Sequence, residues 1–228
     1  MRISAVLLAR TIAFLDTADL NPRGSVNIPG LIPIIAKRFS FQKFPKKFGS
    51  DEENGDKKDD QKGLIFEHGY IEGLTVQNMT LYSDGIKIDL LSSTEDGKRI
   101  IRDTLRWLGD EVGLNFSENM LKRWGFISNL TFESDVDLDA IHPALRLLAE
   151  NVDKLVSSRL GTDIGYRPTG VTLDFERANR EISLAQFTIE RRAKAPFSEN
   201  KYFSSAPLET DDHIFVLQQF ENDIRLSR

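Results

Sequence analysis

A stretch of alternating cations and aromatic side chains is the most distinctive candidate for chemistry in this sequence. Four phenylalanines alternate with one arginine and three lysines within residues 38–48. Aromatic faces stack on nucleic-acid bases and lysines neutralise phosphates, and single-stranded nucleic-acid platforms combine the two. The pattern therefore predicts a basic-aromatic binding edge, whose expected contact residues are Arg38, Phe41, Lys43, Phe44, Lys46 and Lys47.

A structural interpretation of the same stretch stays open beside this one. An edge strand that buries Phe39, Phe41 and Phe44 would show the same alternation, with its lysines protecting the open hydrogen-bonding edge. The sequence contains no RNA-recognition, KH or helix-turn-helix motif that would favour nucleic acid over this alternative.

A second polar-aromatic cluster spans residues 190–205, between an expected strand and an expected helix. Loops of this kind, rich in hydrogen-bonding groups, often contact ligands or partner proteins. The candidate binding residues here are Arg191, Arg192, Asn200 and Tyr202.

An enzymatic alternative uses acids near the same cluster. A metal-dependent nuclease or phosphoesterase would hold its metal with Asp174, Glu176 and Glu190, assisted by Lys194. Such sites usually carry an acid on one strand and an acid-x-lysine on the next. Here Arg192 occupies the place of that lysine, and Lys194 lies four residues after Glu190. The structural alternative is a surface loop held by salt bridges.

Composition removes several other classes of chemistry. The chain has no cysteine, which excludes disulfides, thiolate nucleophiles and cysteine-ligated zinc. Its histidines, His68, His142 and His213, are isolated in sequence, and we expect surface or capping roles for them. There is no Gly-x-Ser-x-Gly elbow, phosphate-binding loop or dinucleotide fingerprint. We therefore expect no cofactor and no metal site.

Charge and hydropathy indicate a compartment and a kind of partner. Net charge is −5, yet residues 1–48 carry eight Lys or Arg against two Asp, so this basic quarter suits a polyanion or an acidic partner. The apolar run near residue 3 is interrupted by Arg10, unlike a secretory signal. No stretch approaches the roughly 18 apolar residues of a membrane span. We expect a cytoplasmic protein without membrane contact.

The periodicity of apolar residues predicts an α+β fold with a mostly antiparallel or mixed sheet covered by three to five helices. We expect a single domain over residues 1–228, with a flexible acidic loop at 49–63. The expected strands are 2–16, 64–71, 75–82, 86–90, 126–133, 171–175 and 184–190, with an extended edge segment at 40–46. The expected helices are 27–37, 92–113, 118–124, 137–159 and one from residue 210 onward, after a loop at 195–209.

Two of these helices have especially clear signals. The helix after Ser92 keeps helical spacing at Ile100, Ile101 and Leu105, and Gly113 ends it. The helix over 137–159 gathers its apolar side chains on one face, and Gly161 stops it. That face comprises Leu145, Leu148, Val152, Leu155 and Val156.

These observations favour a non-catalytic binding or assembly subunit of a larger cytoplasmic complex. A protein partner is expected, single-stranded nucleic acid is a second candidate partner through the basic-aromatic edge, and homo-oligomerisation is left open. The competing hypothesis is the metal-dependent nuclease or phosphoesterase described above.

Overall fold

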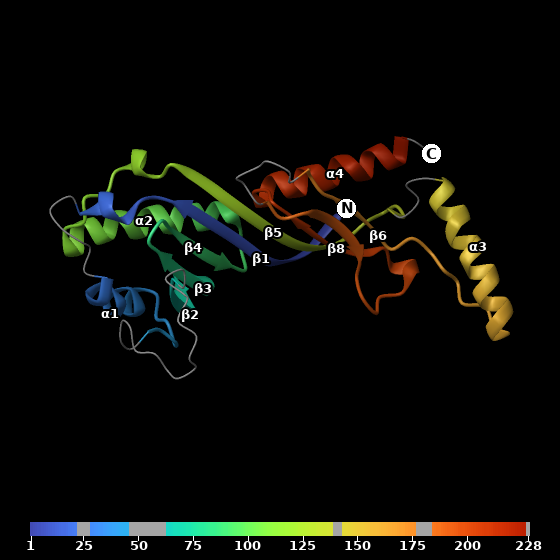
Figure 1. The fold of residues 1–228 in the computed structure, drawn as a ribbon, viewed down its shortest axis with the longest axis horizontal. Helices are drawn as coiled ribbons and strands as arrows, with labels where there is room; N and C mark the ends of the chain where they lie inside the picture. Colours follow the sequence, from blue (N-terminus) through green and yellow to red (C-terminus); the bar gives the residue numbers. More distant parts are fainter. Residues whose placement is uncertain (22–27, 46–62, 139–142, 177–183, 227–228) are drawn as a thin grey trace. The chain divides into compact units, whose positions relative to one another are not determined.

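The computed structural model of the chain describes residues 1–21, 28–45, 63–138, 143–176 and 184–226. Within these residues, eight strands form a sheet in the order β2-β3-β4-β1-β5-β8-β7-β6, and four α-helices accompany it (Figure 1). The expected α+β class with an antiparallel sheet is confirmed. No helix in the described part of the chain is long and apolar enough to cross a membrane.

The described residues divide into two compact units, each considered separately below. The first unit contains Met1–Leu7, Asn129–Pro207 and Asp211–Arg228, and the second contains Leu8–Ser128 and Leu208–Thr210. Two strands, β1 (Arg2–Phe14) and β5 (Arg123–Glu133), contribute residues to both units. The single domain expected over residues 1–228 stays a prediction.

The second unit is a meander of antiparallel strands. Strands β2 (Leu64–Ile71), β3 (Leu74–Tyr82) and β4 (Gly85–Leu90) follow one another, and β4 then pairs with β1. All three fall within a residue or so of their expected bounds. Their alternating apolar residues explain this agreement, because a strand with one buried face has period two. The turn at Ser83–Asp84 closes the expected hairpin.

Two helices belong to the second unit. Helix α2 (Thr94–Val112) begins at Ser93, whose hydroxyl accepts from the Asp96 N–H, and ends at Gly113 in the left-handed region with φ of 74°. Helix α1 (Ile28–Arg38) matches its expected position. Between β1 and β4, Arg10 donates two hydrogen bonds to the buried carboxylate of Asp89, at 2.7 and 2.9 Å. This bond raises the pKa of Arg10, although desolvation opposes the shift.

The first unit packs the C-terminal helix against a short antiparallel sheet. Its strands β6 (Gly170–Leu173), β7 (Phe187–Arg191) and β8 (Lys201–Ala206) pair in sequence. Helix α3 (Pro143–Leu160) and helix α4 (Thr210–Leu226) complete the unit, with α4 entering it at Asp211. The core is apolar and includes Leu130, Phe132, Leu138, Ile189, Tyr202, Leu217 and Ile224.

The loop expected at residues 195–209 is wrong in part, because residues 201–206 form strand β8. Tyr202, Ser204 and Ala206 point to the buried face, and Lys201, Phe203 and Ser205 alternate with them. Two of the three inward side chains, Ser204 and Ala206, are small, so the alternation of large apolar and polar residues is weak in the sequence of this strand. The expected loop therefore contains a paired strand and only a short 3-10 turn, Phe197–Glu199.

Three further predictions either differ from the structure or lie outside its described residues. The helix expected at 118–124 is wrong, because Glu118–Met120 forms a single 3-10 turn and β5 begins at Arg123. The extended segment at 40–46 forms no regular strand over its described residues, and only Lys43 pairs, as an isolated bridge, with Glu67. The acidic loop at 49–63 lies outside the described residues, except for Gly63.

We predict that Gly97→Ala destabilises the protein although it replaces glycine within a helix. Alanine normally favours a helix interior by about 1 kcal/mol. Here the added Cβ would approach Thr11 Cβ to 2.8 Å and overlap Thr11 Oγ1. Overpacking of this kind costs roughly 1–3 kcal/mol, so chemical denaturation should show a net loss. Gly109→Ala, whose nearest neighbour is the Leu114 carbonyl oxygen at 3.1 Å, is the milder control. Equal or higher stability of Gly97→Ala would contradict the close approach.

Candidate functional site

Two of the three described phenylalanines of the basic-aromatic stretch are buried in the second unit. Phe39 is fully buried and Phe41 is 5% exposed. Their rings stack at 5.3 Å between centroids, and the Phe41 ring lies 5.4 Å from that of Phe66. The burial of these two residues agrees with the structural alternative, although the stretch forms no regular strand over its described residues. Phe44, at 41% exposed, stays on the surface.

The two described cations of this stretch, Arg38 and Lys43, have partners in the protein itself. The Arg38 guanidinium lies over the Trp107 ring, 4.3 Å from its centroid. Lys43 exchanges backbone hydrogen bonds with Glu67, and its Nζ lies 3.5 Å from the Glu67 carboxylate. Lys46 and Lys47 lie outside the described residues. A stacking platform needs several aromatic faces in the open, and the described part of the stretch offers one.

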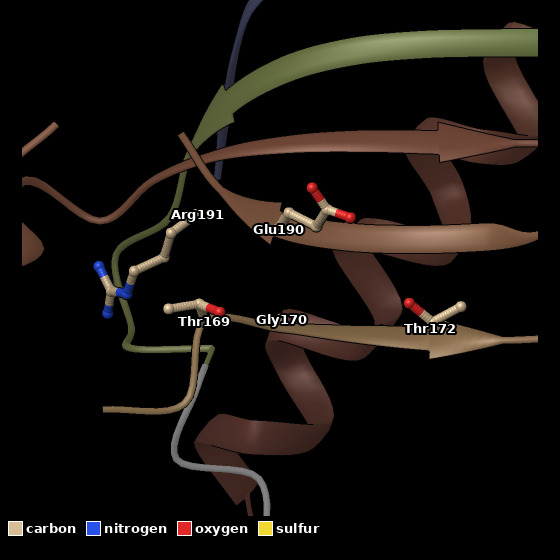
Figure 2. Close-up of a pocket in the computed structure, with 5 residues that line it drawn as sticks. All are labelled: Thr169, Gly170, Thr172, Glu190 and Arg191. Carbon is tan, nitrogen blue, oxygen red and sulfur yellow. The ribbon is translucent and has the colours of Figure 1, made fainter. Parts of the chain in front are cut away.

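The second predicted cluster borders an open hollow of about 280 Å³ between β6 and β7 (Figure 2). Gly170 faces Glu190 across the two strands, and a Cβ at residue 170 would come within 3.2 Å of Glu190 Cα, so the two strands approach each other closely here. Thr169, Thr172 and Arg191 complete the lining. Figure 2 shows the Arg191 side chain pointing away from Glu190, as expected for successive residues of a strand. The polar groups of this hollow therefore do not converge on one point.

Arg191 and Tyr202 stabilise the fold of the first unit. Arg191 donates to Asp137 Oδ1 at 2.8 Å and to the Phe197 carbonyl oxygen at 2.9 Å, and its guanidinium lies over the rings of Phe197 and Tyr202. The buried Tyr202 hydroxyl accepts from the Leu138 N–H at 3.0 Å. Both side chains thus fix residues 137–138, which lie N-terminal to α3.

The other two residues predicted in this cluster lie around the turn before β8. Arg192 is exposed, and its backbone N–H donates to the Lys201 carbonyl oxygen at 2.9 Å. Asn200 ends the 3-10 turn in the left-handed conformation with φ of 45°, which asparagine tolerates better than most residues.

The acids proposed for a metal site do not come together in the described structure. Asp174 accepts from Gln186 Nε2 at 2.7 Å, just beyond the paired part of β6, while Glu190 faces Gly170. Four residues along a strand separate these positions by roughly 13 Å. Glu176 and Lys194 are exposed. Among the described residues, no three acidic or histidine side chains are placed to hold a metal ion.

A buried serine and histidine lie close together, but their polarity is unsuited to nucleophilic catalysis. Ser204 Oγ lies 2.8 Å from His213 Nε2 and donates to the Thr188 carbonyl oxygen at 2.6 Å. Because the hydroxyl proton points to that carbonyl, His213 Nε2 must donate to Ser204 and cannot act as its base. His213 is fully buried, which corrects the surface or capping role expected for it.

A buried acid in α4 organises the N-terminal end of the first unit. Glu221 accepts from the Met1 amino group at 2.7 Å, the Ser134 hydroxyl at 2.6 Å and the Asp135 N–H at 3.0 Å. Burial opposes the ionised carboxylate, yet these three bonds lower the pKa of Glu221. The hydrogen bond to Glu221 also raises the pKa of the amino group, against its desolvation. The four groups act as a structural clamp.

Helix α3 carries the most unusual surface of the described chain. The side chains of Leu148 and Leu155 are 60% and 63% exposed, and Leu145 and Val152 beside them are exposed as well. These four residues, spaced by three, four and three positions, define what we call the leucine stripe. No residue of α3 belongs to the core of the first unit.

The chain after α3 fixes the helix through its opposite, polar side. Asp153 Oδ1 accepts from the N–H groups of Gly165 and Tyr166 at 2.7 and 3.1 Å, and the Ser157 hydroxyl accepts from the Ile164 N–H at 3.2 Å. Asp153 and Ser157 lie on the opposite side of a helical wheel from the leucine stripe. The returning segment therefore covers the polar side and leaves the stripe in water.

The sequence showed this apolar face but not its exposure. The apolar residues have the same helical period whether the face packs against its own core or stays exposed. One signal distinguishes this helix: Arg159 occupies the next position of the three-four spacing, so a charge lies in line with the stripe.

No protein-family model matches this chain, and no curated protein is significantly similar to it.

We predict that Glu221→Gln lowers the free energy of unfolding at neutral pH by on the order of 3 kcal/mol, because it leaves the Met1 amino group without its buried counter-ion. Ser134→Ala, which removes one neutral donor, should cost about 1 kcal/mol. A carboxyl with a lowered folded pKa stabilises the native state above its ordinary pKa. That contribution disappears as the pH falls below about 4. Chemical denaturation from pH 7 to 3 should therefore give a flatter curve for Glu221→Gln than for the unsubstituted protein. Parallel curves would contradict the role of the clamp.

Proposed function

We propose that this chain is a non-catalytic binding subunit of a larger cytoplasmic assembly, and that α3 is the helix through which it docks on a protein partner. The observation that carries the proposal is the leucine stripe, whose central residues Leu148 and Leu155 are more than half exposed. Contiguous exposed apolar side chains of this size usually mark protein interaction sites.

Energetics support a docking role for α3. An 18-residue helix is only marginally stable in water when its apolar face is not packed. Transfer of one exposed leucine side chain into an apolar contact contributes about 1.5–3 kcal/mol when burial is complete. Four such residues, each partly exposed, provide roughly 5 kcal/mol or more, enough for a specific but reversible contact after the entropy cost of association.

The other expected functions have less support in the described residues. Among the described residues, a nucleic-acid platform would lack two of its three aromatic faces, since Phe39 and Phe41 are buried. The nuclease alternative requires carboxylates that converge, and the register of β6 and β7 separates Asp174 from Glu190. Protein binding needs none of these arrangements, and α3 offers the surface for it.

We predict that Leu148→Asp/Leu155→Asp abolishes capture of the native partners from cells of the source organism, because charges in the stripe cannot be buried unpaired. Arg146→Ala/Glu150→Ala is the matched control, as it removes an exposed ion pair of 2.9 Å on the same helix without touching the stripe. Quantitative mass spectrometry should find the same partners with the control as with the unsubstituted chain. Circular dichroism checks that both variants fold. Equal capture by the stripe variant would refute α3 as the docking helix.

A further inference from the structure

We draw no further inference here: the strongest candidate, the exposed leucine stripe of α3, belongs to the docking surface already proposed, and nothing in the described residues shows what covers it.

Discussion

The free energy cost of leaving leucine side chains in water is the constraint on which the account of this protein depends. The apolar core of the first unit is packed, from Leu130 on β5 to Ile224 on α4. Among the described helices, α3 presents a regular stripe of leucine and valine that the described residues leave exposed. Such a helix gains most of its stability from packing, and this is the basis of the proposed docking role.

The clamps of the first unit explain how α3 is displayed. Arg191 and Tyr202 fix residues 137–138, and Asp153 and Ser157 hold the returning segment on the polar side. Arg191 and Tyr202, which the sequence suggested for ligand binding, thus stabilise the segment before α3. Of these residues, Arg191 lines the hollow between β6 and β7, and its guanidinium is already bonded to Asp137 and to the Phe197 carbonyl oxygen. It therefore does not converge with Glu190 on a common point.

Much of the fold could be predicted from local patterns. Strands β2, β3 and β4 alternate apolar and polar residues, and α2 has a serine cap and a terminal glycine, so each contains its own signal. Strand β8 lacked one, because Ser204 and Ala206 fill inward positions where large apolar residues would have revealed the period. The helix start signal at Ser117 is followed by a single 3-10 turn, Glu118–Met120, and not by an α-helix.

The candidate sites were harder to predict, since they depend on which face of each element is covered. Alternation of phenylalanine and lysine is the same for a binding platform and for a buried edge, and only the structure shows that Phe41 packs against Phe39 and Phe66. The spacing of Asp174 and Glu190 permitted a metal site until the pairing register of β6 and β7 placed them apart. Likewise, the apolar face of α3 was visible in sequence, but its exposure is a tertiary property.

Hydrogen exchange of the α3 backbone amides tests the central claim most directly. In dilute protein we expect the amides of α3 to exchange faster than those of the core-packed helices α2 and α4, because the leucine stripe is unpacked. If α3 in dilute protein exchanges as slowly as α4, the helix is stable without a partner and the account is contradicted.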